Sequence, residues 1–529
     1  MPIRPAHALA ASAALALVGL AATAVPAAAR PAGPDVTLTP LGTYATGTFA
    51  SGASEIVAHD PIRQRLFVVN AQAGTVDVLS IADPAQPTKV GTLATPGANS
   101  VAVHQNLIAV AEQAAVKTDP GTVGLFDART LEPLASVPVG SLPDMVTITG
   151  NGNYALVANE GEPDTYCAGG TDPVGSVSII DLRGGAQRAT VATADFVGLD
   201  ARRAELTAAG VRIFGPNATV AQDLEPEYVT TSTDGRTAYV SLQENNALAT
   251  IDIASATVTG VRALGLKDHN LVGFGLDASD KDKAIAIRPW PVKGMYQPDS
   301  IAAYQVKGVE HVVTANEGDA RAYGCFAEEV RIGDKAFVLD PGAFPNAADL
   351  KKDANLGRLN ATTTSPKGAG GVTEIDTFGA RSISVWDTRT GALTWDSGDA
   401  LEQLVARTQP TWFNSDHETA SFDNRSDNKG PEPEGLSLGR IGGRTFAFVG
   451  LERQSGIAVF DVTDPTVGRL AGFGSNRDFT GDPKAGTAGD LGPEGVLFIP
   501  AGDSPTGAPL LAVGNEVSGT TTLWSLSTS

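Results

Sequence analysis

The chain has 529 residues, including 59 Gly and 33 Pro, and a formal net charge of −21. A field of this sign repels nucleic acid and anionic lipid, so nucleic-acid binding is excluded as the expected role and cations or basic partners are favoured. Aromatic residues are sparse, and runs rich in Val, Ile and Thr recur between turn residues, a pattern that is typical of an all-β protein.

The first residues have the features of an export signal. Arg4 precedes an uncharged apolar stretch over residues 8–24, and alanines at 27–29 provide a small-residue cleavage site. A transmembrane anchor is disfavoured because the apolar core is short and a Pro-containing polar segment follows it. We therefore expect residues 1–29 to be a signal peptide. Because residues 523–529 form no second hydrophobic anchor, we expect a secreted, extracellular protein without a membrane span.

One pattern recurs seven times along the remaining chain. A carboxylate or hydroxyl residue opens an apolar strand, a second strand ends in Asn or Glu, and a third often ends in Asp. The opening residues are Glu55, Ser100, Asp144, Glu227, Asp299, Glu434 and Glu494. Second strands are expected over residues 66–70, 107–112, 154–160, 238–244, 311–317, 445–452 and 510–516. Third strands are expected over residues 75–81, 122–127, 176–181, 247–252, 382–387, 456–461 and 520–526.

The spacing of these repeats indicates the fold. The first two intervals are 45 and 44 residues, the length of a four-stranded propeller blade. Later intervals are longer, which predicts loop insertions in blades 3 to 6, including a short helix over residues 201–209. A β-sandwich is the alternative, but it does not explain seven triplets in the same order. The sequence predicts a seven-bladed β-propeller of the YVTN/WD40-like type over residues 30–529.

The closure of the ring is also predicted. The seventh repeat ends near residue 526 without a fourth strand, whereas residues 36–45 are strand-like and belong to no repeat. We expect this N-terminal segment to complete the last blade and so remove a free sheet edge. Pro40 fits an edge position, where one backbone donor can be spared.

The opening and closing carboxylates define a candidate cation site. In a propeller the first strand follows the central channel and the second returns to the same face, so these residues are expected at one channel mouth. Crowded carboxylates push one another toward protonation unless a cation lies among them. Oxygen ligands of this kind suit Ca²⁺ or Mg²⁺. The predicted metal ligands are Glu55, Asp144, Glu160, Glu227, Asp299, Glu317, Glu434, Glu452, Glu494 and Glu516.

Basic side chains offer a second way to neutralise the same carboxylates. Arg321, Arg425, Lys429 and Arg453 lie nearby in the sequence. The first three are also candidate anion-binding residues, because a guanidinium or ammonium group can hold a phosphate.

The polar segment 422–434 superficially resembles a calcium loop. Asp423 and Glu434 have the separation of the first and last ligands of an EF-hand, but Asn428 stands where that motif requires Gly. We therefore interpret the segment as a loop that delivers Glu432 and Glu434 to the channel mouth.

The cysteines occupy related positions. Cys167 follows the run Asn-Glu-Gly-Glu at 159–162, and Cys325 follows Asn-Glu-Gly-Asp at 316–319. In an exported chain this arrangement favours one disulfide between the loops of blades three and five. Two separate buried thiols are the alternative.

Several longer motifs carry a family resemblance. They are residues 142–144, 157–163, 314–321 and 430–435, and through them the chain resembles the bacterial choice-of-anchor I family. That family is similar to the mesenchyme-specific cell surface glycoproteins of biomineralising animals. The resemblance implies an extracellular propeller that is released or displayed by varied C-terminal anchors. Some relatives carry an alkaline-phosphatase label, and the animal relatives imply the handling of calcium mineral.

Two functions are compatible with these features. The first is a non-catalytic binding protein in which hard cations organise the channel mouth for an extracellular protein or a phosphate-bearing ligand. The second is a metal-dependent, alkaline-phosphatase-like phosphoesterase that uses the same carboxylates to hold metal and activate water. The negative mouth opposes an anionic substrate, and no Gly-x-Ser-x-Gly, His-Glu-x-x-His or phosphate-loop motif is present. The sequence therefore favours the binding protein.

Overall fold

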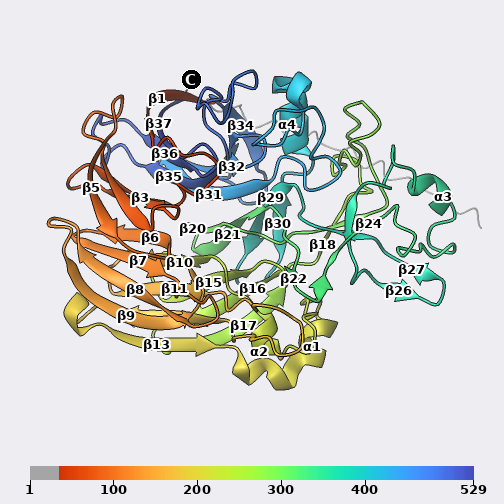
Figure 1. Ribbon diagram of the computed structural model, residues 1–529, viewed down its shortest axis with the longest axis horizontal. Coiled ribbons are helices and arrows are strands. Elements are labelled where there is room, and N and C mark those ends of the chain that lie inside the picture. The colour runs from red at the N-terminus through yellow and green to blue at the C-terminus, as the bar shows by residue number, and fades with distance from the viewer. Residues whose placement is uncertain (1–34, 529) are drawn as a thin grey trace, which may run out of the picture. The chain divides into compact units, whose positions relative to one another are not determined.

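The computed structural model describes residues 35–528, and these residues are predominantly β-structure. The predicted signal peptide lies outside the described residues. Within them the backbone forms seven four-stranded antiparallel sheets, which succeed one another in chain order (Figure 1). An all-β, propeller-like architecture follows from this arrangement.

The first three sheets follow each other with short connections. The first contains β2 (Val57–Asp60), β3 (Arg65–Asn70), β4 (Thr75–Ser80) and β5 (Thr88–Ala94). The second contains β6 (Ala98–His104), β7 (Leu107–Glu112), β8 (Pro120–Asp127) and β9 (Pro133–Ser141). The third contains β10 (Pro143–Ile148), β11 (Tyr154–Asn159), β12 (Ser176–Asp181) and β13 (Thr190–Asp195).

The next three sheets are separated or interrupted by long loops. The fourth contains β14 (Val229–Thr231), β15 (Thr237–Leu242), β16 (Ala247–Asp252) and β17 (Thr257–Ala263). The fifth contains β20 (Ile301–Val306), β21 (Val309–Asn316), β29 (Ser382–Asp387) and β30 (Leu393–Asp396). The sixth contains β31 (Pro433–Ile441), β32 (Arg444–Leu451), β33 (Gly456–Asp461) and β34 (Arg469–Gly474).

The last sheet combines both ends of the described chain. β35 (Pro493–Ile499), β36 (Leu510–Asn515) and β37 (Thr520–Thr528) are consecutive, and β1 (Val36–Ala45) pairs antiparallel with β37 (Figure 1). The register shifts between Pro40 and Gly42, so the proline lies at a bulge on the outer strand of this sheet. This position accommodates its missing N–H.

The hydrophobic core lies between consecutive sheets. Val69 and Val78 of the first sheet pack with Val101 and Val110 of the second, and comparable clusters join each later pair. Another cluster joins Leu66 of the first sheet to Leu510 of the last. Each sheet packs against a neighbouring sheet on both faces. Its inner strands are therefore continuous apolar runs, as in residues 66–69.

The expected insertions contain most of the remaining elements. Short helical segments are η1 (Ala186–Arg188), η2 (Val197–Arg202), α1 (Arg203–Ala208), α2 (Val220–Asp223), α3 (Ala347–Leu350), α4 (Ala400–Thr408) and η3 (Pro410–Trp412). One three-stranded sheet contains β18 (Leu266–Asp268), β19 (Lys293–Met295) and β28 (Asp376–Thr377). Three hairpins pair β22 (Ala322–Tyr323) with β23 (Phe326–Ala327), β24 (Glu329–Arg331) with β25 (Asn360–Thr362), and β26 (Lys367–Gly368) with β27 (Gly371–Val372).

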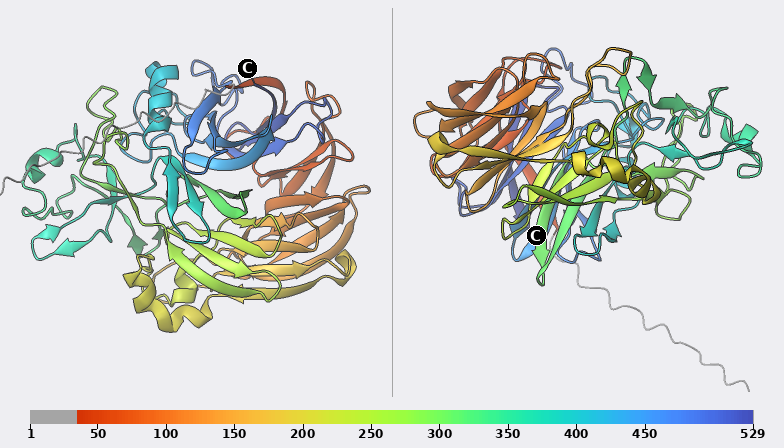
Figure 2. Two further views of the ribbon diagram at one scale, coloured as in Figure 1. Left: turned by 180° about the vertical axis from the view of Figure 1, so that it is seen from behind. Right: turned by 90° about the horizontal axis from the view of Figure 1, so that it is seen from below.

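The insertion that carries α3, β24, β26 and β27 projects to one side of the large sheets (Figures 1 and 2). The helix expected over residues 201–209 is present as α1, preceded by the 3-10 turn η2. Among residues 35–528, no helix has the length and apolar character needed to cross a bilayer.

Candidate cation-binding mouth

Backbone irregularities position several opening residues. The register between first and second strands shifts where Asp144, Glu434 and Glu494 occur, at the beginnings of β10, β31 and β35. A β-bulge turns a residue out of the regular ladder, which frees its side chain from the alternation of the sheet. These openers therefore begin their strands without packing into the apolar layers between sheets.

The Pro-Glu-Gly motifs at 433–435 and 493–495 also bring neighbouring sheets into close contact. A Cβ atom on Gly435 would lie 1.8 Å from the backbone O of Glu494, and one on Gly495 would lie 2.3 Å from the backbone O of Glu55. Only glycine permits this approach. Glu434, Glu494 and Glu55 therefore occupy equivalent positions on three adjacent sheets.

A cavity of about 650 Å³ lies along the first strands of the sheets. Its lining includes residues 56–59 at the first sheet, parts of β6, β10, β31 and β35, and the residues just before β14 and β20. The charged residues in its wall are Asp144, Glu227, Asp299, Glu317, Asp319, Lys429, Glu434, Glu452, Arg453 and Glu494. We call the charged end of this cavity, together with Glu55, Glu160 and Glu516 beside it, the acidic mouth.

Most of the predicted ligands fall into groups at the acidic mouth, and two of these groups share Glu516. In each group, one oxygen or nitrogen atom per residue lies within 4.8 Å of the others. The groups are Glu55 with Glu494 and Glu516, Asp299 with Glu317 and Glu434, Glu452 with Glu516 and His417, and Glu160 with Glu225 and Glu244. Asp144 and Glu227 line the cavity next to these groups.

Three cations surround Glu432, which immediately precedes β31. Lys429 Nζ lies 3.1 Å from Glu432 Oε2, Arg453 Nε lies 3.1 Å from the same oxygen, and Arg425 Nη2 lies 2.5 Å from Oε1. Burial opposes ionisation of Glu432, but these three positive charges hold its pKa well below the ordinary value. Arg453 also reaches Glu452, at 3.2 Å. On this side of the mouth the protein supplies its own counter-charges.

The other side is not neutralised in this way. Burial, followed by Glu516 and Asp144, raises the pKa of Glu55 to about 8. Burial, followed by Glu55 and Glu516, raises the pKa of Glu494 well above its ordinary value. Burial and the charges of Asp299 and Glu162 raise the pKa of Asp144 to about 7. These carboxylates repel one another in a partly desolvated space.

Several carboxylate oxygens at the mouth lack hydrogen-bond partners. They include the buried Oε2 atoms of Glu227, Glu434 and Glu494. A buried polar atom without a partner costs about 1–3 kcal/mol, and more when it is charged. The mouth therefore contains oxygen atoms that a proton or a metal cation would satisfy.

The candidate anion-binding residues are all in ion pairs. Arg321 is fully buried, where it pairs with Asp223 and, at 2.9 Å, with Glu225. Lys429 Nζ contacts Glu317 Oε1 at 2.5 Å, and Arg425 contacts Glu432.

Sequence reasoning missed Glu225 as a member of the mouth. It precedes Pro226 and Glu227, just as Glu432 precedes Pro433 and Glu434. In both Glu-Pro-Glu runs the first glutamate pairs with a buried cation and the second borders the cavity. This repetition is the signal that could have identified it.

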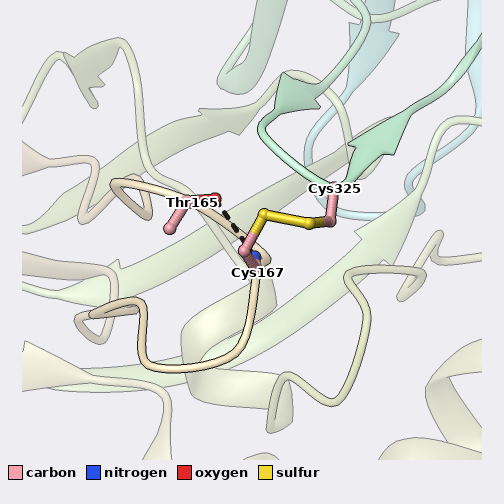
Figure 3. Close-up of a disulfide and its surroundings, with 3 residues drawn as sticks. All are labelled: Thr165, Cys167 and Cys325. Carbon is pink, nitrogen blue, oxygen red and sulfur yellow. Dashed lines mark hydrogen bonds between the residues drawn. A yellow bond between two sulfur atoms is a disulfide. The ribbon is translucent and has the colours of Figure 1, made fainter.

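The predicted disulfide is confirmed. Cys167 and Cys325 are joined, with their Cα atoms 5.0 Å apart, and their sequence separation is 158 residues (Figure 3). The backbone N–H of Cys167 donates to Thr165 Oγ1 at 3.1 Å. Tyr166 packs edge-on against Tyr323 beside the bond. The disulfide thus fixes the loop after β11 to the β22–β23 hairpin.

The sequence model of the choice-of-anchor I domain matches residues 55–465, which is most of the chain. The protein belongs to the choice-of-anchor I family. The matched region contains six of the seven opening residues, with Glu494 beyond its end.

Two curated relatives of this family member are similar over part of their length. A protein named mesenchyme-specific cell surface glycoprotein from Strongylocentrotus purpuratus is 32% identical over 291 residues, covering 47% of this chain and 36% of the relative. Gigasin-3a from Magallana gigas is 32% identical over 187 residues, covering 33% of this chain and 66% of the relative. The matches span less than two thirds of either relative.

A solved structure of the Swd1 (Cps50) β-propeller domain from Myceliophteria thermophila aligns with a TM-score of 0.43 and 10% identity. The alignment covers 91% of this chain and 99% of that domain. This TM-score is too low to support an argument about the fold, so the fold is described from the sheets alone.

Proposed function

We propose that this choice-of-anchor I protein is a secreted or surface-displayed binding protein that holds Ca²⁺ or Mg²⁺ at the acidic mouth. The observation that carries the proposal is the set of buried, unpartnered Oε2 atoms of Glu227, Glu434 and Glu494 around one cavity. A bound divalent cation offsets the repulsion between carboxylates that raise one another's pKa. All-oxygen ligands suit hard cations.

The proposed framework is a closed, seven-bladed propeller over residues 30–529, preceded by a signal peptide over residues 1–29. Two observations support closure. The first strands contact one another in the order β2, β6, β10, β14, β20, β31, β35 and again β2. The apolar cluster that includes Leu66 and Leu510 joins the last sheet to the first. Pairing of β1 with β37 would then act as the clasp of the ring.

An extracellular location is supported by three features. The first is the apolar N-terminal stretch with its alanine-rich cleavage site. The second is the disulfide, which forms and persists in oxidising compartments. The third is the name of the sea-urchin relative, which describes a cell surface glycoprotein. An extracellular protein or a phosphate-bearing ligand is the proposed class of partner for the metal-loaded mouth.

The phosphoesterase hypothesis has less support. It requires free cations to hold an anionic substrate, whereas Lys429, Arg425 and Arg321 each contact carboxylates. A binding role requires only that metal occupy the oxygens already grouped at the mouth.

Isothermal titration of chelator-treated protein with Ca²⁺ and with Mg²⁺ tests the proposal. The wild type should release or absorb heat on binding, and the double variant Glu434→Gln/Glu494→Gln should bind at least about tenfold more weakly. Glu132→Gln, which changes an exposed carboxylate, is the matched control and should bind as the wild type does. A double variant that binds as many ions as the wild type, with the same affinities, would refute binding at the mouth.

The same preparations separate binding from catalysis. Incubation with a chromogenic phosphate ester at alkaline pH, with added Ca²⁺, should give no turnover. Hydrolysis that disappears in Glu434→Gln would favour the phosphoesterase.

A further inference from the structure

A second group of carboxylates lies outside the acidic mouth. Asp277 is in the loop between β18 and β19, Asp282 follows in the same loop, and Asp423 is in the loop between η3 and β31. One carboxylate oxygen of each lies within 4.8 Å of those of the other two. Two insertions far apart in the sequence therefore bring three acidic side chains together.

Local hydrogen bonds hold these side chains in place. Asp277 Oδ2 accepts from the N–H of Ala286 at 2.6 Å, and Asp282 Oδ1 accepts from the N–H of Ala284 at 3.0 Å. Asp423 Oδ1 accepts from Ser426 Oγ at 2.6 Å. Backbone N–H groups therefore hold Asp277 and Asp282, and the hydroxyl of the buried Ser426 holds Asp423.

A buried oxygen without a partner supplies independent evidence for a ligand. Asp423 is only 1% exposed, and its Oδ2 atom has no hydrogen-bond partner. Asn414 is fully buried, and its Oδ1 atom also lacks a partner. Asn414 Nδ2 donates to Ser426 Oγ at 2.9 Å, so both unpartnered oxygens belong to one hydrogen-bond network. Leaving such atoms unsatisfied is costly unless something binds them.

The charges around this group increase the need for a counter-ion. Among residues 35–528, no lysine or arginine forms an ion pair with Asp277, Asp282 or Asp423. The nearby Arg381 pairs with Glu402 at 2.6 Å and donates to the backbone O of Asp277. Burial, followed by Glu402, raises the pKa of Asp277 to about 7. Burial, opposed by Ser426 and reinforced by Asp277 and Asp282, raises the pKa of Asp423 to about 8.

We propose that Asp277, Asp282 and Asp423 bind a Ca²⁺ ion that is separate from any cation at the acidic mouth. Carboxylate oxygens in a loop-built site are ligands that Ca²⁺ prefers. Bound there, the ion joins the β18–β19 loop to the segment that continues through Arg425 and Lys429 to β31. It therefore fixes the segment that delivers Glu432 and Glu434 to the mouth.

Calcium stoichiometry tests this site independently of the mouth. In chelated protein titrated with Ca²⁺, Asp423→Asn and Asp282→Asn should each lose one bound ion or bind it at least about tenfold more weakly. The exposed Asp119→Asn is the control and should bind as the wild type does. In the Glu434→Gln/Glu494→Gln background, one ion should remain and be lost when Asp423→Asn is added. If the acidic mouth binds no Ca²⁺, Asp423→Asn should still remove this one ion.

Hydrogen exchange of the wild-type protein provides a measurement that needs no variant to fold. Ca²⁺ should slow amide exchange by about tenfold or more in peptides covering both residues 277–286 and 414–428. Wild-type stoichiometry and affinity in both aspartate variants would overturn the proposal. Unchanged exchange in both peptides at saturating Ca²⁺ would overturn it as well.

Discussion

Lys429 Nζ lies 2.5 Å from Glu317 Oε1, although the two residues belong to different insertions of the chain. Lys429 comes from the segment before β31, and Glu317 follows β21. The same ammonium group contacts Glu432. One side of the acidic mouth thus contains a lysine, whereas within residues 35–528 no lysine or arginine forms an ion pair with Glu55, Glu494 or Glu516.

Replacing Lys429 with Met should destabilise the protein. The ammonium group is largely buried, so its loss leaves Glu317 and Glu432 with fewer counter-charges and should cost about 3 kcal/mol of unfolding free energy. Lys89→Met removes a more exposed cation, which pairs with Asp77, and should cost less than about 1 kcal/mol. Chemical denaturation measures both. Equal small losses would contradict the structural role of Lys429.

The stability of metal-free protein should fall as the pH rises. The pKa of Glu55 is raised from its ordinary value of 4.5 to about 8, so the folded state favours the neutral carboxyl. Its contribution is complete below about pH 4.5 and is lost as the pH rises through about 8. Because Ca²⁺ binds the ionised form, added Ca²⁺ should raise the melting temperature more at the alkaline end of this range than at the acidic end. Equal calcium-induced shifts at both ends would argue against metal at Glu55.

Removing the disulfide, which joins loops of the third and fifth sheets, should destabilise the fold. The sequence separation of the bond is 158 residues, so Cys167→Ser/Cys325→Ser should lower the free energy of unfolding by about 2–5 kcal/mol. Reduction of the wild-type protein should produce a similar loss, which controls for the serine substitutions. A double variant as stable as the oxidised wild type would show that the bond does not constrain the fold.

Deleting β1 should lower the melting temperature sharply. Val36 and Leu38 are 3% and 8% exposed and pack against Trp524, and burial of two such side chains contributes about 3–6 kcal/mol. A chain that starts at Ser51 is compared with one that starts at Asp35, which retains the strand. Identical thermal melts for the two chains would contradict closure through the N-terminal strand.

Most of the fold could be predicted because each repeat has apolar strands and turn residues in the same order, even where insertions lengthen the later repeats. The second strands match closely, for example residues 107–112 with β7 and residues 510–516 with β36. First strands are less predictable at their beginnings, since β14 starts only at Val229, after Glu227. The opening residue lies in a bulge or in a loop before the strand. Neither feature alters the pattern of apolar residues from which the strand is predicted.

The site was less predictable because its charge balance depends on long-range contacts. Glu112 ends β7 like the other closing residues, yet it lies against Gly124 in a separate pocket, and burial raises its pKa to about 7. The contacts of Lys429 with Glu317 and of Asp423 with Asp277 join segments more than a hundred residues apart. No local pattern specifies these pairs.

Crystals grown with Ca²⁺ and measured for anomalous scattering test the central claim most directly. The account predicts an anomalous peak at the acidic mouth. Oxygen atoms of Glu434 and Glu494 should lie roughly 2.3–2.6 Å from it, the distances typical of Ca²⁺ ligands. A mouth without a peak at saturating Ca²⁺, with its carboxylates bonded to water or to one another, would contradict it.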